Sequence, residues 1–164
     1  MNFLTGDGGA DTTEVVQRPA VATDVDTLVA LDRLCFGPQA WPRRVWWEVV
    51  CEPSWMVSLV IAAGQAIAVS VQRVMPPTAH LASLAVHPEW RRRGIAARLL
   101  QQAIERASGV ARWLALEVDR DNQGALRLYR AHGFVAVRRF LEDGRIRLEM
   151  ARRLPTARRA RQRP

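Results

Sequence analysis

The most restrictive feature of this sequence is a change of hydrophobic period within residues 79–107. Residues 79–86, AHLASLAV, form a short apolar run of the β type. Residues 94–107, GIAARLLQQAIERA, repeat apolar positions every three to four residues, which predicts an amphipathic helix. The turn between them, HPEWRRR, contains a proline and three consecutive arginines. A strand that passes through such a turn into a helix predicts a mixed α/β fold.

The remaining periodicity predicts the other elements. Three helices are expected, at 23–37, 41–52 and 122–133. Thr23 and Asp26 form a variant of the capping box, Pro42 lies in the first turn of the second helix, and Gly133 ends the last one. Further strands are expected at 14–22, 54–64, 66–75, 112–118, 134–143 and 144–154. The order β-α-α-β-β-β-α-β-α-β-β predicts one central mixed sheet of six to seven strands flanked by about four helices, with a last hairpin around Asp143 and Gly144.

Composition divides the 164 residues into one domain with two extensions. Residues 1–13 are rich in Gly, Asp and Thr and are expected to be a disordered leader, residues 14–150 the domain, and residues 151–164 a disordered tail. All 24 basic residues are arginine, and the tail holds six of them and no acid. We therefore expect the basic character to describe the tail rather than the fold, either as a solvated extension or as a weak contact with RNA, a ribosome or another acidic surface.

Several classes of protein are disfavoured by the sequence. No apolar run is long enough to span a bilayer and no signal peptide opens the chain, so we expect a cytoplasmic protein without a membrane contact. Cys35 and Cys51 are expected to be buried free thiols in a reducing compartment, with a disulfide or redox pair as the alternative. No grouping of metal ligands surrounds His87 or His132, which suit a turn and a helix end, so no metal is expected.

The three arginines precede a helix start, and this placement points to an anion. The first amides of a helix have no internal acceptor and lie at the positive end of its dipole. Gly94 and Ala96 keep side-chain bulk away from those amides, and Arg91 to Arg93 add charge, so a diphosphate would fit. The alternative is a tight turn at Gly94 with solvated arginines.

Two stretches together closely resemble the GNAT family of acetyl-CoA-dependent N-acetyltransferases. They are VHPEWRRRGIA at 86–96 and LEVDRDNQGALRLYRAHGF at 116–134. The second is similar to the RimI type, bacterial enzymes that acetylate the N-terminus of a ribosomal protein. The resemblance covers residues 14–150 and implies the GNAT fold, with its sheet splayed around a cleft for acetyl-CoA, the co-substrate.

The resemblance also implies roles for particular residues. The amides of the arginine-glycine loop would hold the pyrophosphate of coenzyme A, the preceding strand would pair with the pantetheine arm, and an asparagine would contact that arm. The cofactor-binding residues so implied are Leu84, Ala85, Val86, Arg92, Arg93, Gly94, Ile95, Ala96, Ala97 and Asn122. In the RimI type a glutamate acts as base and a tyrosine as acid, and these positions are Glu117 and Tyr129.

Elementary chemistry agrees with these roles. A carboxylate at a strand end, such as Glu117, can take the proton of the attacking amine. The amide of Val86 could hold the oxyanion, and Tyr129, placed seven residues after Asn122 on about the same helix face, could supply the proton as sulfur departs. The alternatives are an ion-paired strand-end acid for Glu117 and a space-filling core residue for Tyr129.

The acceptor amine is less well defined. RimI-type enzymes carry a tyrosine-rich stretch after the second motif, and residues 134–150 contain none. Trp41, Trp46 and Trp47 either complete the core or wall the acceptor site. Asp119 and Asp121 either attract a cationic acceptor or cap the next helix. The expected function is transfer of acetyl to a protein N-terminal amine by a monomer or homodimer. The alternatives are a small-molecule amine or lysine as acceptor, and a non-catalytic CoA-binding or ribosome-associated module.

Overall fold

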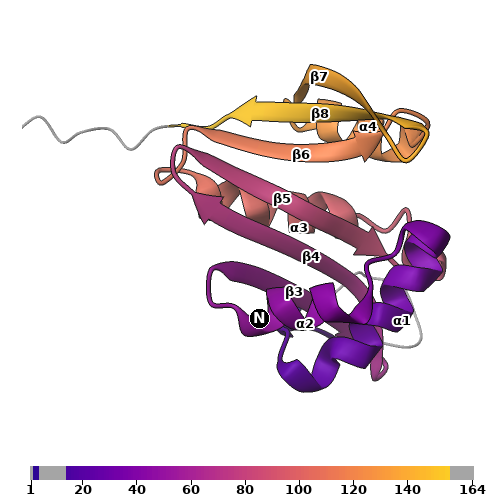
Figure 1. Ribbon diagram of the computed structural model, residues 1–164. Coiled ribbons are helices and arrows are strands. Elements are labelled where there is room, and N and C mark those ends of the chain that lie inside the picture. Colours follow the sequence, from indigo (N-terminus) through magenta and orange to yellow (C-terminus); the bar gives the residue numbers. More distant parts are fainter. Residues whose placement is uncertain (1, 4–13, 156–164) are drawn as a thin grey trace, which may run out of the picture. The chain divides into compact units, whose positions relative to one another are not determined.

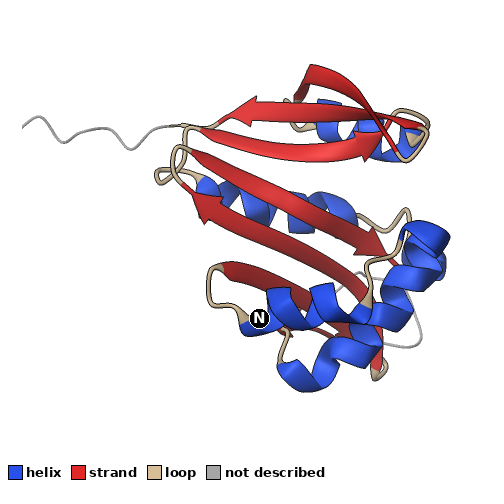
Figure 2. Cartoon of the chain, in the orientation of Figure 1, coloured by secondary structure: helices blue, strands red, loops and turns tan. Residues whose placement is uncertain are grey.

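The structure, a computed structural model, describes residues 2–3 and 14–155. It consists of helices and strands joined by short loops (Figure 2). These residues divide into two compact units, one formed by the described residues up to 72 with 83–100, and the other by 73–82 with 101–155. The strands are numbered along the chain, with bounds given below. In the first unit the hydrogen-bonded strands follow the order β1-β2-β3-β4-β5, and in the second the order is β5-β6-β8-β7, because β5 is divided between the two units. The predicted mixed α/β architecture is confirmed, and the described residues form four α-helices and eight strands, where six to seven strands were predicted.

The first unit contains the N-terminal strands and helices (Figure 1). Its elements are β1 (Asn2–Phe3), β2 (Val15–Pro19), α1 (Val25–Phe36), α2 (Arg43–Cys51), β3 (Trp55–Ala62), most of β4 (Gln65–Met75), the end of β5 (Thr78–Val86) and the start of α3 (Ile95–Ala107). Helices α1 and α2 pack on each other, and α2 packs on β3. Trp46 is fully buried in their core with Leu28 and Leu59, so this tryptophan belongs to the interior of the unit.

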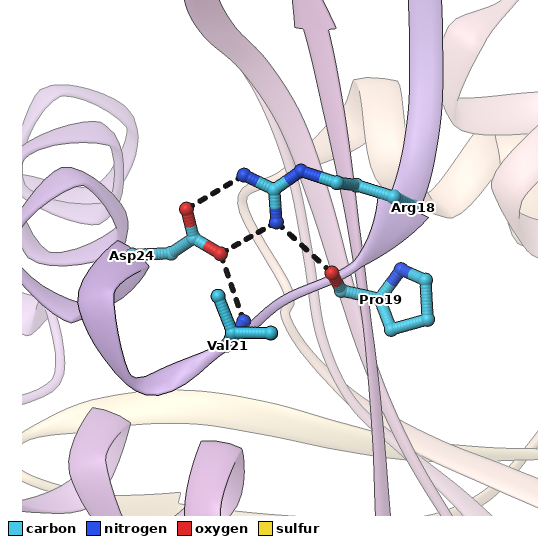
Figure 3. Close-up of polar contacts among 4 residues, drawn as sticks. All are labelled: Arg18, Pro19, Val21 and Asp24. Carbon is cyan, nitrogen blue, oxygen red and sulfur yellow. Dashed lines mark hydrogen bonds and ion pairs between the residues drawn. The ribbon is translucent and has the colours of Figure 1, made fainter.

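Helix α1 is preceded by a single 3₁₀ turn, Ala22–Asp24, and the cap differs from the predicted one. The Asp24 carboxylate accepts a hydrogen bond from the amide of Val21 at 2.8 Å, while the Asp24 amide donates to the Val21 carbonyl at 2.8 Å. The same carboxylate accepts hydrogen bonds from the two terminal nitrogens of the Arg18 guanidinium, Nη1 at 2.6 Å and Nη2 at 2.8 Å (Figure 3). The prediction of Thr23 as the cap was therefore wrong, because Thr23 lies inside the turn that Asp24 closes.

The second unit is built on three strands and the last helix. Its elements are the start of β5, the end of α3, β6 (Trp113–Asp119), α4 (Gln123–Ala131), β7 (Val135–Glu142) and β8 (Arg145–Arg153). Strand β6 pairs in parallel with β5 and antiparallel with β8, which pairs antiparallel with β7. The β7–β8 turn places Asp143 at φ 48° and Gly144 at φ 75°, as the predicted tight hairpin requires.

The two faces of the β6–β8–β7 sheet differ in chemistry. Register pairs Leu116 with Met150, and both are buried, as are Leu126 and Tyr129 of α4. On the same face, Arg152 of β8 donates a hydrogen bond to the His132 carbonyl at the C-terminal end of α4. The α4 side of this sheet is therefore apolar at its centre, with Arg139 and Arg152 on the same face, and most of the other charged residues of the strands alternate onto the opposite face.

The ends of the chain differ in part from the expectation. Asn2 and Phe3 pair with Val16 and Val15, and the rest of the expected leader lies outside the described residues. Strand β8 continues to Arg153, so the expected boundary at residue 150 lies inside a strand that β6 and β7 both pair. Residues 156–164 of the expected tail lie outside the described residues.

Both cysteines are free thiols, as predicted. Cys51, at the end of α2, is exposed and Cys35 is partly buried, so the expectation that both are buried was wrong for Cys51. Within residues 2–3 and 14–155, no helix has the length and apolar character that crossing a bilayer requires.

Candidate active site

The predicted anion site is a left-handed turn that leads into α3. Arg92 has φ 64° and Gly94 has φ 77°, with the helix beginning at Ile95. The helical hydrogen bonding starts with the Arg98 amide, which donates to the Gly94 carbonyl at 3.1 Å. The amides of residues 95–97 therefore precede the first helical bond and have no acceptor within the helix. A turn with left-handed residues directs successive amides to one side, which is the geometry of an anion-binding nest.

Gly94 is explained by its backbone conformation rather than by packing. A Cβ built on Gly94 would have no heavy atom within 4 Å. A positive φ is readily adopted by glycine and is strained in other residues. Arg92 adopts the same region without being glycine, and such outliers gather at functional sites. The open space beside Gly94 is where a ligand could approach the backbone.

The three arginines of the turn are not equivalent. Arg91 donates from Nε to the Val86 carbonyl at 3.2 Å, which ties the turn to the end of β5. Arg93 lies over the ring of Trp90, 4.7 Å from its centroid. All three side chains are exposed; Arg91 and Arg93 help to fix the turn, and Arg92 occupies the strained position.

The end of β5 carries the predicted pantetheine-pairing residues Leu84, Ala85 and Val86. Pairing with β6 extends from Thr78 to Leu81 of β5, although β5 itself continues to Val86. Ala85 is buried, whereas Leu84 and Val86 are half-buried.

The sequence did not predict that Cys35 of α1 also lies at this strand end. Its thiol donates to the Val86 carbonyl at 3.4 Å. Desolvation in this half-buried position raises the pKa of Cys35 above its ordinary value, so the thiol stays protonated. No local motif around Cys35 signals this contact.

In the second unit, Glu117 lies on the charged face of β6. It is directly opposite Glu149 of β8 in the register. Its carboxylate lies 3.8 Å from Arg147 Nη2, and Arg147 also donates from Nη1 to Glu142 at 3.0 Å. Glu149 is paired with Arg138 at 2.8 Å. Glu117 is therefore an exposed acid with one shared cation, and the sequence pattern did not identify Arg147 as that cation.

Asn122 and Tyr129 occupy different parts of α4. Asn122 is the N-cap, and its Oδ1 accepts a hydrogen bond from the Ala125 amide at 3.1 Å. Its backbone is not helical, so the prediction that it shares a helix face with Tyr129 was wrong. Tyr129 is buried beside Phe134, with ring centroids 5.9 Å apart, and burial raises the pKa of its phenol to about 12. The hydroxyl therefore stays protonated across the physiological range.

Other singled-out residues have structural explanations. His87 accepts from the Glu89 amide in a turn, and His132 caps the C-terminal end of α4, as predicted. Asp32, which the sequence patterns did not single out, is buried and accepts hydrogen bonds from the Trp41 amide at 2.6 Å and from Trp46 Nε1 at 3.1 Å.

Three other residues that the sequence singled out for the acceptor side lie nearer the surface, namely Trp47, Asp119 and Asp121. Trp47 is exposed, with Arg43 5.9 Å from its ring centroid. Asp119 is paired with Arg145 at 2.6 Å and accepts from the Asp121 amide at 2.8 Å, as a loop-ordering acid does. Among the residues that the structure describes, no group of three or more His, Cys, Asp or Glu is arranged to hold a metal ion.

Comparison with known proteins assigns the chain to a family. The family model for the acetyltransferase (GNAT) family matches residues 28–134, which include both the left-handed turn and α4. The chain belongs to this family of acetyltransferases. A comparison with curated proteins found no matching relative.

Solved structures share the fold at low identity. The ribosomal-protein-S18-alanine N-acetyltransferase from Escherichia coli has a TM-score of 0.78 and 21% identity, over 89% of this chain and 97% of its own. NAA60 of Arabidopsis thaliana, solved with a bisubstrate analogue, has a TM-score of 0.76 and 20% identity, over 85% and 98%. The PaiA N-acetyltransferase from Thermoplasma acidophilum, in complex with coenzyme A, has a TM-score of 0.70 and 17% identity, over 85% and 98%.

Proposed function

We propose that this chain transfers the acetyl group of acetyl-CoA to the α-amine of a protein N-terminus, directly within a ternary complex. The observation that carries the proposal is the turn formed by Arg92 and Gly94, which leaves the first amides of α3 without helical partners. Membership of an acetyltransferase family supports the donor, and the relative named for N-terminal alanine acetylation supports the acceptor. The bound donor would supply the activated thioester carbonyl and a thiolate leaving group.

The turn and the strand before it would bind the donor. The amides of Ile95, Ala96 and Ala97 would donate to the diphosphate, and the exposed guanidinium of Arg92 would add a full positive charge. The backbone of Leu84 to Val86 would pair with the extended pantetheine arm, and the Val86 amide would donate to the oxyanion. A donor of the last kind is typically worth about 2.7–4 kcal/mol in the transition state.

Glu117 would act as the general base. An α-amine has a pKa near 7.7–8.0, so a sizeable fraction is neutral at physiological pH, whereas a lysine amine, near 10.4, is almost wholly protonated. An exposed carboxylate such as Glu117 can take the α-amine proton directly or through one water. The nitrogen then forms its bond to the acetyl carbon while the carbon–sulfur bond breaks.

Tyr129 would stabilise the sulfur as it leaves. Its raised pKa keeps the hydroxyl protonated and able to donate. Because that pKa lies above the ordinary thiol value of about 8.5, the hydroxyl would act chiefly by a strong hydrogen bond to the thiolate rather than by complete proton transfer. Asn122 has its Oδ1 engaged in capping α4, which leaves its amide hydrogens to donate to the donor arm.

Binding of the donor can be tested with two matched glycine variants. Gly94→Ala places an alanine at φ 77°, and Gly64→Ala does the same at φ 75° in the β3–β4 turn of the same unit. Neither Cβ meets an atom within 4 Å, so the two variants share the same backbone strain. Calorimetry with coenzyme A should show binding to the wild type and Gly64→Ala and at least tenfold weaker binding to Gly94→Ala. Equal coenzyme A binding by both variants would show that the turn is not part of the donor-binding site.

The acceptor can be tested with peptides that differ only in their amines. Acetyl-CoA is supplied with a lysine-free peptide, with the same peptide blocked at its N-terminus and containing one lysine, and with a polyamine, and thiol release is followed. Intact mass then locates the acetyl group. We expect turnover with the free N-terminus, reduced at least a hundredfold in Glu117→Gln. Preferential acetylation of the lysine peptide or polyamine would refute the N-terminal assignment, and binding without any turnover would favour a non-catalytic module.

A further inference from the structure

Positive charge is distributed very unevenly between the two units. The described part of the first unit, residues 2–3, 14–72 and 83–100, has eight arginines and seven acidic residues. The described part of the second unit, residues 73–82 and 101–155, has twelve arginines and seven acidic residues. Residues 156–164 add four arginines and no acid. The expectation that the excess charge belongs to a tail alone is therefore corrected, because the folded part of the second unit carries a net charge of +5.

On the Glu117 face of the β6–β8–β7 sheet, three arginines are neutralised by carboxylates. Arg138 pairs with Glu149 at 2.8 Å, Arg145 with Asp119 at 2.6 Å, and Arg147 with Glu142 at 3.0 Å. Each of these arginines has a carboxylate on the same or a neighbouring strand. This group of residues therefore contributes little to the net charge of the unit.

The arginines of the opposite face, where α4 lies, are not neutralised in this way. Arg127 and Arg130 are three residues apart on the exposed side of α4, a helix that contains no acidic residue. Arg139 of β7 is paired in register with Leu148, which places it on the α4 side of the sheet. Within the described part of the chain, none of these three exposed arginines makes an ion pair. We call Arg127, Arg130, Arg139 and Arg152 the basic strip.

Arg152 connects the strip to the end of the sheet. Its Nη1 donates to the His132 carbonyl at 2.6 Å, beside the C-terminal end of α4. The next residue, Arg153, ends β8 and lies opposite Trp113 in the β6–β8 register. Trp113 is 40% exposed, an unusual solvent contact for an indole. Because side chains alternate along a strand, Trp113 lies on the Glu117 face rather than on the face of the strip. A bound chain that passes from the strip along β8 would reach its ring at the end of the sheet.

We propose that the basic strip binds single-stranded RNA. Guanidinium groups match phosphate oxygens through paired N–H donors, and unpaired arginines need no carboxylate to be displaced first. An exposed indole at the end of a cationic surface can stack an unpaired base, which a base-paired duplex does not offer. The unmatched arginines of α4 and β7 give the complementary field that a phosphate chain requires. This inference does not depend on the proposed acetyl transfer.

The proposal is tested by the salt dependence of RNA binding. Fluorescence anisotropy is measured for the full chain with a labelled single-stranded RNA over a series of salt concentrations. The strip variant is Arg127→Gln, Arg130→Gln, Arg139→Gln. Each lost phosphate contact should lower the slope of log K against log salt by about 0.7, so the variant should lose about two units of slope. The matched control removes three exposed arginines from the first unit, Arg33→Gln, Arg43→Gln, Arg44→Gln, and should keep the wild-type slope.

Three further measurements separate the strip from the C-terminal arginines and from the donor site. The full-length variant Arg158→Gln, Arg159→Gln, Arg161→Gln, Arg163→Gln should still bind RNA, with a slope that the strip substitutions reduce further. Binding should persist when coenzyme A is present in excess, and Trp113→Ala should weaken single-stranded RNA more than duplex DNA. The proposal is overturned if the strip and control variants behave alike, if the four C-terminal substitutions abolish binding, or if coenzyme A displaces the RNA. Circular dichroism on every variant confirms that the fold is retained.

Discussion

Tyr129 offers a direct test of how the second unit is packed. It is the only tyrosine, and the chain has no lysine, so few groups change charge between about pH 9 and pH 12. Burial beside Phe134 raises the pKa of this phenol from 10.0 to about 12. The phenolate of the unfolded chain, which is in water, forms near pH 10.

The shift determines the sign and the size of the pH effect on stability. Because the folded state holds the proton more tightly than the unfolded state, raising the pH above 10 favours the unfolded chain. A shift of two units corresponds to about 2.7 kcal/mol once both states are ionised. At about pH 11, where the unfolded state is mostly ionised and the folded state mostly neutral, the loss should be about 1.4 kcal/mol. Tyr129→Phe has no proton to lose and should lack this component.

Two measurements are needed. Tyrosinate absorbance should give a midpoint near pH 12 in the folded protein and near pH 10 in urea. Urea unfolding of the wild type and Tyr129→Phe at a series of pH values should show a constant difference in stability below about pH 9 and a growing one above pH 10. The difference between the two proteins also cancels the contribution of the cysteine thiols. A folded-state midpoint near 10, or parallel stability curves, would mean that the hydroxyl is in contact with water and would contradict the buried proton donor.

Three further outcomes follow from carboxylates and their partners. Asp24→Asn should lower the free energy of unfolding, measured with urea at neutral pH, by about 0.5–2 kcal/mol. The difference should fade as acid protonates the wild-type Asp24 carboxylate, whose pKa is lowered by Arg18. The exposed control Asp26→Asn should have a much smaller effect. Burial raises the pKa of Asp32, so the stability of the wild type relative to Asp32→Asn should increase on mild acidification and decrease as the pH returns to neutral. Arg147→Met removes the cation that lies 3.8 Å from the Glu117 carboxylate and should lower kcat/KM, because nothing then holds that carboxylate in place, whereas an unchanged kcat/KM would separate this cation from the general base.

The elements could be predicted because their signals are local. Helical and strand periods, the Asp143-Gly144 turn and the glycine after α4 depend on neighbouring residues, and each predicted element is present. The cap of α1 was mistaken because the choice between Thr23 and Asp24 depends on Arg18, which reaches the carboxylate from the preceding strand. Strand β1 was missed because two residues carry no periodicity, and only pairing with β2 defines them.

The site could be predicted where a motif fixes the backbone and not where tertiary contacts decide. The run RRRG predicted the turn before α3, but not that Arg91 and Arg93 are held by Val86 and Trp90. The partners of Glu117 come from β8, about thirty residues further along the chain, so no local pattern could name Arg147. Likewise, helical spacing put Asn122 on the face of Tyr129, whereas the capping hydrogen bond holds it outside the helix.

The division of charge across the second unit has a consequence for both proposals. Arg138, Arg145 and Arg147 on the Glu117 face are matched by carboxylates, so the general base would work in a field that is locally almost neutral and would not repel a cationic amine. Arginines on the α4 face are unmatched, and a phosphate chain would be attracted there. Because the strands between the two faces alternate their side chains, a single sheet keeps these opposite requirements apart. Raising the salt concentration should therefore weaken RNA binding steeply while it changes kcat/KM for a neutral-peptide acceptor very little, and a parallel loss of both would show that one surface serves both purposes.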